Sequence, residues 1–376
     1  MAFTQPRVSY YNGGGERYAL DAIKALSAHS ENEIYLFTTK SKLPETDHYR
    51  DFKANYGEKI KIFELALPKK IEYIYNIEPG ELRYRWDIES INFNALIYNE
   101  LKHHKIDILW SFYILDGIFI PESVKSIINL IGYPREKTYY LEGLLSRYDL
   151  IVSNSFNVIS KWNDILAKKI KKYKVLPQGI NLGLNHPGNK KNNNNNNNNI
   201  VIMFAGRYIE RKGIIDLISS FSILKKRYNN IELRLFGEGP LLNEMNFLVI
   251  DKKLNGSVII NGFVNNIKVE MQNADFCVFP SWKGEGLMST VLEAMYYNGL
   301  VLTTSDNGSE EVIDNGVNGL IVSPNSTKEL VDAMSKIISN MSDFENMRVA
   351  AKKTIFDNFS WKNYSEKFNI IINSLN

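Results

Sequence analysis

The chain alternates between short apolar runs and longer stretches in which apolar residues recur at helical spacing. A run of about four to eight apolar residues is typical of a buried strand, and the longer spacing predicts an amphipathic helix. Because strands and helices alternate, the pattern predicts parallel sheets covered by helices, which is an α/β fold. The predicted strands cover residues 33–38, 106–112, 127–131, 150–153, 200–205, 231–236, 258–262, 276–280 and 300–304, with a short first strand near the N-terminus.

A tract of consecutive asparagines, residues 192–199, interrupts this alternation near the middle of the chain. Such a tract cannot build a hydrophobic core, so we interpret residues 186–199 as a flexible linker or loop insert. It separates an N-terminal domain, residues 1–185, from a C-terminal domain, residues 200–356, each of ordinary domain size. The closing segment, residues 357–376, has helical apolar spacing and is predicted to be a terminal helix. We therefore expect two doubly wound, Rossmann-like domains.

Composition and charge narrow the classes of partner. The sequence has 376 residues, 44% apolar and 23% charged, which is enough chain for two ordinary cores. A formal net charge of +3 is small for this length and argues against nucleic acid as a partner. The single cysteine, Cys277, excludes an intramolecular disulfide and falls in an apolar run, where we expect it to be buried. No secretory signal or membrane-spanning run is recognisable, so we expect a cytoplasmic protein.

The most informative loop joins the predicted strand 276–280 to a helix that we expect Ser289 or Thr290 to cap. Glu285 falls in the loop and Glu293 about one turn into the helix. Both acids thus flank a helix N-terminus, where free amides and the helix dipole favour a phosphate. Taken alone, a helix acid favoured by the dipole and a solvated loop acid explain the pair equally well.

Other strand ends also carry polar or glycine-rich loops. Arg207 and Lys212 follow the strand 200–205, at the sheet edge where open α/β sheets bind ligands. Two cations there suit a diphosphate, with a solvated basic loop as the alternative. Gly237 and Val264 lie in the glycine-containing loops after the next two predicted strands, where glycine lets the backbone approach a ligand closely.

In their order along the chain these segments resemble glycosyltransferase family 4, the retaining enzymes also described as glycosyl transferases group 1. The resemblance implies the GT-B fold, in which two Rossmann-like domains face each other across a cleft and the C-terminal helix crosses back to the N-terminal domain. It also implies transfer of a sugar from a nucleotide diphosphate donor. The matching segments are Gly206-Arg207 with Lys212-Gly213, Phe236-Gly237-Glu238-Gly239-Pro240, Pro280-Ser281 through Glu285-Gly286 to Glu293-Ala294-Met295, and Gly316-Val317-Asn318-Gly319.

The resemblance also implies roles for residues, position by position. Arg207 and Lys212 would hold the donor diphosphate, Glu285 would lie beside the donor sugar, and Glu293 would bind the ribose hydroxyls. Glu285, Arg207 and Lys212 are thus the candidate catalytic residues. We expect no metal ligand, and no cofactor apart from the nucleotide sugar as co-substrate. The predicted donor-binding set is Arg207, Lys212, Gly237, Val264, Glu285, Gly286, Leu287, Met288, Ser289 and Glu293.

The sequence departs from the family pattern at two places. Leu287 and Met288 stand where a Phe-Gly pair is commonest in the family. Many members also carry a histidine after an N-domain strand, but the matching residues here, 129–134, contain none. Either Tyr133 or a nearby polar group substitutes for that histidine, or the activity is altered.

The N-terminal half contributes a glycine turn that resembles the family's N-terminal glycine loop. Gly14 and Gly15 lie in this turn, before a predicted helix at 18–27. The resemblance implies that this turn faces the donor phosphates and the acceptor, with a plain glycine turn as the alternative.

A lysine-rich segment, residues 168–174, follows a predicted helix with an apolar face. It could give weak contact with an anionic membrane that carries a lipid-linked acceptor. A charged helix end whose apolar face packs on the N-domain sheet is the favoured alternative.

These observations predict a retaining, metal-independent hexosyltransferase of glycan or glycoconjugate biosynthesis. Its donor would be a UDP- or GDP-sugar, and its acceptor a hydroxyl of a glycan, lipid-linked or protein-linked molecule. The alternatives are a nucleotide-sugar epimerase of GT-B shape and a catalytically impaired nucleotide-sugar-binding protein.

Overall fold

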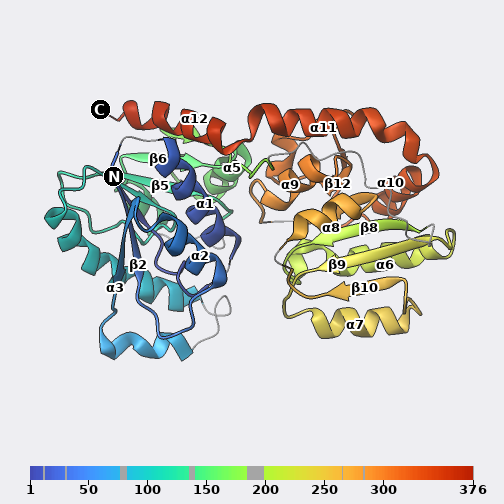
Figure 1. The fold of residues 1–376 in the computed structure, drawn as a ribbon, viewed down its shortest axis with the longest axis horizontal. Helices are drawn as coiled ribbons and strands as arrows, with labels where there is room; N and C mark the ends of the chain where they lie inside the picture. The colour runs from blue at the N-terminus through green and yellow to red at the C-terminus, as the bar shows by residue number, and fades with distance from the viewer. Residues whose placement is uncertain are drawn as a thin grey trace. The chain divides into compact units, whose positions relative to one another are not determined.

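The computed structural model describes residues 1–11, 13–29, 32–76, 83–134, 140–183, 199–264, 266–282 and 284–375. The chain forms two compact units (Figure 1). Unit 1 is Met1–Gly179 with Trp361–Asn376, and unit 2 is Ile180–Ser360. The predicted linker at 186–199, apart from Asn199, lies outside the described residues.

Unit 1 is built on a seven-stranded sheet with the strand order β3-β2-β1-β4-β5-β6-β7. Each neighbouring pair is parallel, as the alternation of strands and helices predicted. The strands are β1 (Ala2–Thr4), β2 (Ile34–Thr39), β3 (Ile60–Leu65), β4 (Ile108–Ser111), β5 (Lys125–Leu130), β6 (Leu150–Ser153) and β7 (Tyr173–Val175). The helices are α1 (Gly14–His29), α2 (Asp47–Tyr56), the 3₁₀ helix η1 (Lys69–Asn76), α3 (Arg83–His103), α4 (Leu141–Leu145), α5 (Phe156–Ile165) and α12 (Trp361–Asn373).

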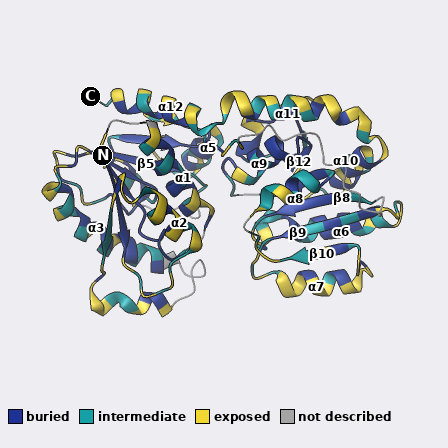
Figure 2. Ribbon diagram, in the orientation of Figure 1, coloured by how far each residue is buried: buried dark blue, intermediate teal, exposed yellow. Residues whose placement is uncertain are grey.

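The two faces of this sheet bury different sets of strand residues, because successive side chains of a strand point to opposite sides. Leu36 and Trp110 pack in one cluster with residues of α1, α2 and α12. Their neighbours Tyr35 and Leu109 pack in another cluster with residues of α3. Figure 2 shows the strands dark blue and the outer faces of the helices yellow. The sheet is therefore covered on both faces, as a doubly wound fold requires.

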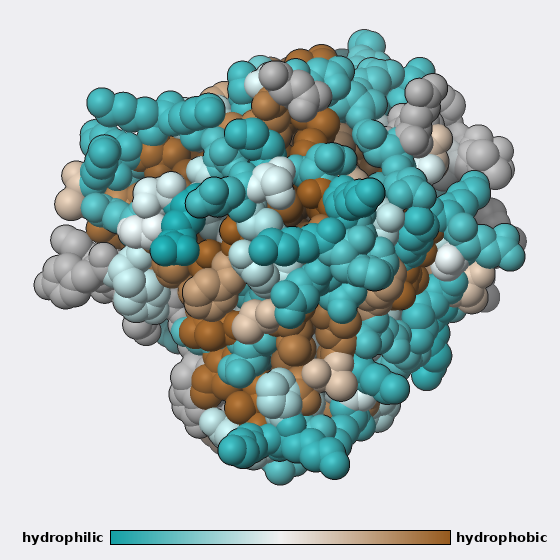
Figure 3. All heavy atoms as spheres, turned by 90° about the vertical axis from the view of Figure 1, so that its left-hand side faces the viewer, coloured by the Kyte–Doolittle hydropathy of each residue, from teal (hydrophilic) through white to brown (hydrophobic). Residues whose placement is uncertain are grey.

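The apolar face of α5 belongs to this core. Val158, Ile159 and Trp162 are buried in a cluster that also holds Ile128 and Ile151 of the sheet. This arrangement matches the favoured alternative for the lysine-rich segment, a charged helix end whose apolar face packs on the sheet. Among the helices that the structure describes, none is long and apolar enough to cross a membrane. On the face of the molecule in Figure 3, hydrophilic side chains predominate and hydrophobic atoms show between them.

Unit 2 has a six-stranded sheet with the order β10-β9-β8-β11-β12-β13, in which every neighbouring pair is parallel. Cys277 is buried in β11, as predicted. The strands are β8 (Ile200–Ala205), β9 (Ile231–Phe236), β10 (Val258–Asn261), β11 (Phe276–Phe279), β12 (Val301–Thr304) and β13 (Leu320–Val322). The helices are η2 (Glu210–Lys212), α6 (Ile214–Lys225), α7 (Leu242–Asp251), α8 (Ile267–Asn273), α9 (Ser289–Tyr297), η3 (Gly308–Glu311), α10 (Thr327–Ser339), η4 (Met341–Phe344) and α11 (Glu345–Asn358).

The terminal helix α12 returns to unit 1, as the resemblance implied. Its residues Tyr364 and Phe368 are buried against the sheet and α1. The hydroxyl of Tyr364 lies 3.2 Å from that of Tyr18 on α1. The chain leaves unit 1 next to the point where it comes back, since Ile180 N donates to Phe359 O at 2.8 Å. The two crossings therefore form a paired connection between the units.

Candidate functional site

The predicted donor residues lie at one edge of the unit 2 sheet. All carboxyl ends of a parallel sheet meet at the same edge, so the loops after β8, β9, β10, β11 and β12 gather there. Tyr208, in the loop after β8, joins three of them. Its hydroxyl is within hydrogen-bond distance of the carbonyls of Leu235 (2.9 Å) and Asn261 (2.5 Å), and its amide donates to Glu238 O at 2.7 Å. This buried tyrosine fixes the spacing of the loops.

Two glycines allow these loops to pack backbone against backbone. Gly213 has a φ of 65°, and a Cβ added there would lie 2.1 Å from Pro280 O. At Gly237, with a φ of 142°, an added Cβ would lie 1.9 Å from Gly206 O. A larger residue at either position would push the loops apart. The glycines of the motifs thus have a structural role as well as the predicted one in the donor site.

A charged cluster joins the loop after β8 to the loop after β11. Lys212 Nζ lies 3.2 Å from Glu285 Oε2, and Arg211 Nη1 lies 2.9 Å from Glu285 Oε1. The side chains of Lys212 and Glu285 are each only 13% exposed. Lys212 and Glu285, two residues of the predicted donor site, therefore lie together. Arg211 was not among the predicted residues.

The electrostatics of the cluster favour an anion. Burial lowers the pKa of Lys212, the Glu285 carboxylate opposes this shift, and the nearby cations Arg211 and Arg207 lower the pKa further. This set holds three cations, Arg207, Arg211 and Lys212, and the one carboxylate of Glu285, which leaves an excess of positive charge within the set. Arg207 is exposed, and its side chain forms no ion pair with the residues that the structure describes. Its guanidinium therefore faces solvent, where a ligand can reach it.

The other acid of the pair lies where the sequence predicted. Glu293 is on the second turn of α9 with its side chain half-buried, and its charge contributes to the raised pKa of Tyr297. The prediction that Ser289 or Thr290 caps this helix is wrong. Ser289 is already helical, and Met288 at the cap position makes no side-chain capping hydrogen bond. The Met288 side chain thus does not cap the end of the helix where a phosphate would approach.

The remaining residues of the predicted donor set differ in burial. The side chains of Leu287 and Met288 are buried in the core of unit 2, so any contact from them to a ligand would come from backbone groups. Met288 also lies near the charged cluster, with its Sδ 3.6 Å from Lys212 Nζ. Gly286 is buried, Val264 is half-buried and Ser289 is exposed.

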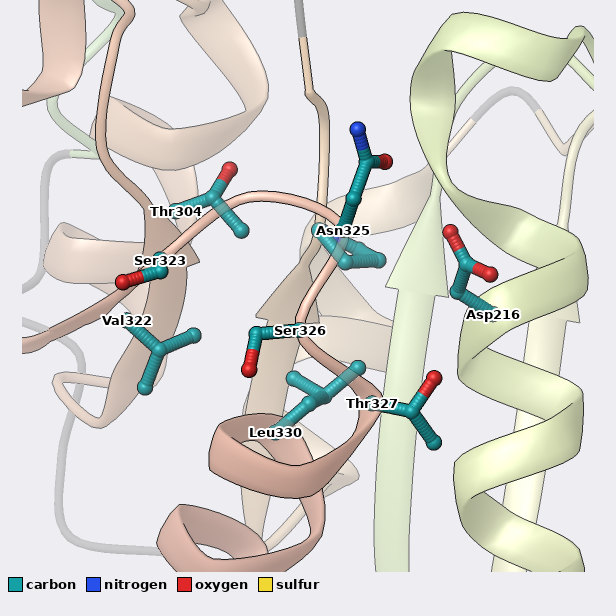
Figure 4. Close-up of a pocket in the computed structure, with 9 residues that line it drawn as sticks. Asp216, Thr304, Val322, Ser323, Asn325, Ser326, Thr327 and Leu330 are labelled. Carbon is teal, nitrogen blue, oxygen red and sulfur yellow. The ribbon is translucent and has the colours of Figure 1, made fainter.

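Near this edge is a small pocket between α6 and the start of α10 (Figure 4). Its labelled side chains carry mostly hydroxyl and amide groups, with the Asp216 carboxylate on the α6 side. None of the predicted site residues lines it. The lining residues are Asp216, Pro280, Thr304, Val322, Ser323, Asn325, Ser326, Thr327 and Leu330.

In unit 1, the glycine turn meets the loop after β5. Gly14 and Gly15 begin α1, and a Cβ added to Gly15 would lie 3.0 Å from the side chain of Ile131. Tyr133, in the same loop as Ile131, donates its hydroxyl hydrogen to Asn157. The structure therefore brings these predicted residues to neighbouring loops, with the Tyr133 hydroxyl engaged by an amide oxygen.

A buried group of charges lies next to the glycine turn, and sequence reasoning missed it. Arg7 is 2% exposed and lies 3.5 Å from Asp116, 3.8 Å from Glu89 and 3.8 Å from Glu16, the acid in the first turn of α1. Burial raises the pKa of Asp116 to about 7, and the charges of Glu89 and Glu16 add to this effect. The Gln5-Pro6-Arg7 segment before the turn was the available signal, but it does not show what surrounds Arg7.

Comparison with known proteins shows which family the C-terminal part of the chain matches. The model of the family described as Glycosyl transferases group 1 matches residues 186–354, which contain the whole charged cluster. A protein of Methanocaldococcus jannaschii named uncharacterized glycosyltransferase MJ1069 is 24% identical to this chain. The alignment covers 96% of this chain and 95% of that protein. The lipopolysaccharide core biosynthesis glycosyltransferase LpsE of Rhizobium meliloti is 23% identical to this chain, and the alignment covers 93% of this chain and 92% of LpsE.

Solved structures show the same fold. One is the crystal structure of Anabaena HepE in complex with UDP and glucose. Its superposition on this chain covers 99% of each chain, with 16% sequence identity and a TM-score of 0.76. Sucrose-phosphate synthase from Thermosynechococcus elongatus covers 100% of this chain, with 98% of its own chain matched, at 16% identity and a TM-score of 0.79.

Residues 186–354 thus match the family Glycosyl transferases group 1, and the whole chain has the two-domain GT-B fold of these solved structures. The resemblance inferred from the motifs is confirmed.

Proposed function

We propose that the protein transfers a hexose-type sugar from a UDP- or GDP-sugar to a hydroxyl of a glycan acceptor, with retention of the anomeric configuration. The observation that carries the proposal is the charged cluster at the unit 2 sheet edge. There, Arg211 and Lys212 contact the Glu285 carboxylate, the charge of Arg207 acts on Lys212, and the adjacent N-terminus of α9 has no capping hydrogen bond from its Met288 side chain. A diphosphate would bring the negative charge that this arrangement lacks.

The reaction requires stabilisation of the leaving diphosphate more than an added nucleophile. The acceptor oxygen forms its bond to the anomeric carbon on the face from which the phosphate oxygen departs. The acceptor's proton goes to that departing oxygen, and the nucleoside diphosphate is released. Lys212 and Arg207 would neutralise the charge that develops on it. We propose that these cations make a metal ion unnecessary.

The two acids have separate parts in this proposal. Glu285, held beside Lys212, would accept hydrogen bonds from the hydroxyls of the donor sugar. Glu293, about one turn into α9, would do the same for the ribose hydroxyls. A bound UDP and glucose in the HepE structure support a nucleotide and sugar for this fold. LpsE, named for lipopolysaccharide core biosynthesis, supports a glycan acceptor.

Unit 1 supplies no histidine beside its glycine turn, and Tyr133 already bonds Asn157. Proton transfer directly to the leaving diphosphate needs no such histidine. If the missing histidine instead abolishes catalysis, the protein would be a nucleotide-sugar-binding protein.

A thermal-shift screen of the full chain against UDP, UDP-glucose, GDP and GDP-mannose tests the proposal first. One nucleotide and its sugar should raise the melting temperature selectively. Incubation of that nucleotide sugar with a panel of glycan acceptors should then release the nucleoside diphosphate and give an α-linked product from an α-linked donor. Isomerisation without acceptor would identify an epimerase, and binding without transfer or hydrolysis would identify a binding protein. No stabilisation by any of the four compounds would refute the proposed donor site.

A further inference from the structure

Arg211 ties the acidic loop after β11 to the basic loop after β8. It lies in the 3₁₀ turn η2, directly before Lys212. Its Nη1 donates to Gly284 O at 2.5 Å and lies 2.9 Å from Glu285 Oε1. Its own carbonyl accepts a hydrogen bond from Trp282 N at 3.0 Å. One residue thus holds the acidic loop by two backbone groups and one carboxylate.

Lys212 contacts the same loop in a different way. Its Nζ lies 3.2 Å from the second oxygen of Glu285 and 3.6 Å from the sulfur of Met288. These are both side-chain contacts, so Lys212 does not hold the loop backbone. If Lys212 turned toward an anion, Arg211 would still fix Glu285 and the loop. The reverse is not true, because Lys212 has no bond to Gly284.

Each oxygen of the Glu285 carboxylate thus pairs with a different cation, and in a donor site the two cations could act separately. We propose that Arg211 is a positioning residue, which keeps the Glu285 carboxylate and the acidic loop in place while Lys212 engages the donor diphosphate. The inference rests on the proposed function, in which the diphosphate meets Lys212 and the sugar meets Glu285. Arg211 would then act on the sugar end of the donor through Glu285.

Substitution of Arg211 should separate the sugar from the nucleotide. The full-length Arg211→Met variant is titrated by calorimetry with UDP and with UDP-glucose, or with GDP and GDP-mannose if the wild-type protein binds that pair. Loss of the ion pair to the Glu285 carboxylate and of the hydrogen bond to Gly284 O predicts that the Kd for the nucleotide sugar rises by about tenfold. The Kd for the nucleotide alone should change by less than about threefold.

Arg207→Met is the matched control, because it removes a cation of the same loop that forms no ion pair with the described residues. It should raise both Kd values by a similar factor. An equal rise of both values in Arg211→Met would overturn the proposal, since Arg211 would then be a phosphate ligand. A wild-type protein that binds neither pair would instead refute the proposed function before Arg211 is tested.

A double-mutant cycle tests whether Arg211 acts through Glu285. In a Glu285→Gln background, Arg211→Met should weaken nucleotide-sugar binding much less than it does in the wild-type protein. Additive losses would overturn the proposal.

Arg211→Lys keeps the charge and covers the case that Arg211→Met does not fold. Arg211 Nη1 contacts both Gly284 O and Glu285, and a lysine keeps the charge on a side chain of different length and shape, so the nucleotide-sugar Kd of Arg211→Lys should lie between those of the wild type and Arg211→Met. A Lys variant with nucleotide and nucleotide-sugar Kd values raised equally would also overturn the proposal.

Discussion

Replacement of Asp116 by asparagine should stabilise unit 1 at neutral pH. The folded carboxyl is fully buried and holds its proton to a pKa of about 7, whereas its ordinary pKa is 3.8. Between about pH 4 and pH 7 the folded state therefore binds more protons than the unfolded state, so the free energy of unfolding falls as the pH rises through this window. The asparagine side chain of the variant cannot ionise, and the variant should lack this loss.

The size of the effect follows from the gap between the two pKa values. About three pKa units, at about 1.4 kcal/mol per unit, set an upper bound of roughly 4 kcal/mol at pH 7 and above. The gain in stability should be smaller than this bound, because the surroundings of Asp116 relax around its charge and because an amide is a weaker partner for Arg7 than a carboxylate. We therefore expect Asp116→Asn to raise the free energy of unfolding at pH 7.5 by about 1–2 kcal/mol, and to change it little at pH 4.

Urea unfolding followed by tryptophan fluorescence at pH 4, 5, 6, 7 and 8 measures the difference. Four of the five tryptophans lie in unit 1, so this signal reports mainly on that unit. Asp51→Asn is the matched control, because Asp51 is an exposed aspartate of the same unit. The reasoning would be refuted if the free energies of unfolding of the wild type and Asp116→Asn differed by a constant amount across this pH range. It would also be refuted if the variant were less stable at pH 7.5.

Four further outcomes are expected. Tyr208→Phe removes a buried hydroxyl that bonds two backbone carbonyls, so calorimetric or urea unfolding should show unit 2 destabilised by about 1–3 kcal/mol, and an unchanged stability would contradict its role in joining the loops. Lys212→Met and Glu293→Ala should each weaken nucleotide-diphosphate binding by about tenfold or more in calorimetry, and unchanged affinity in both would refute the site assignment. Dialysis against EDTA should leave the transfer rate unchanged, whereas strict dependence on magnesium or manganese would contradict a metal-independent reaction. Burial raises the pKa of Cys277 to about 12, so iodoacetamide at pH 8 should modify it in urea but not in the folded protein, as mass spectrometry would show.

Sequence patterns predicted the interior of both sheets but missed three of their edges. The strands β3, β7 and β13 lie at sheet edges, and their residues are mostly half-buried or exposed. An edge strand is covered less completely, so it needs fewer apolar residues and its pattern is weaker. The predicted strand β10 is the exception, since its run 258–262 is apolar enough to be recognised.

The same distinction applies to the charged residues. Lys212 and Glu285 were both assigned to the donor site from the sequence, because each follows a strand of the same parallel sheet and such strand ends share an edge. Arg211 could not be assigned in this way, because only the folded turn decides which side chains of three successive polar residues face the neighbouring loop. Arg7 was missed for a related reason: its partners come from three distant segments of the chain.

The charged group of unit 2 has more cations than acids and that of unit 1 has more acids than cations, and this difference supports the proposed place of the diphosphate. In unit 2, Arg207, Arg211 and Lys212 outnumber Glu285, and Arg207 is open to solvent. In unit 1, the buried group beside the glycine turn has three carboxylates around Arg7, with Arg85 the other cation near Glu89. Cations that acids already surround in a buried group have little charge left for a ligand. On the proposed function we therefore expect the diphosphate at the unit 2 edge, and we expect the unit 1 charges to hold the glycine turn through Glu16.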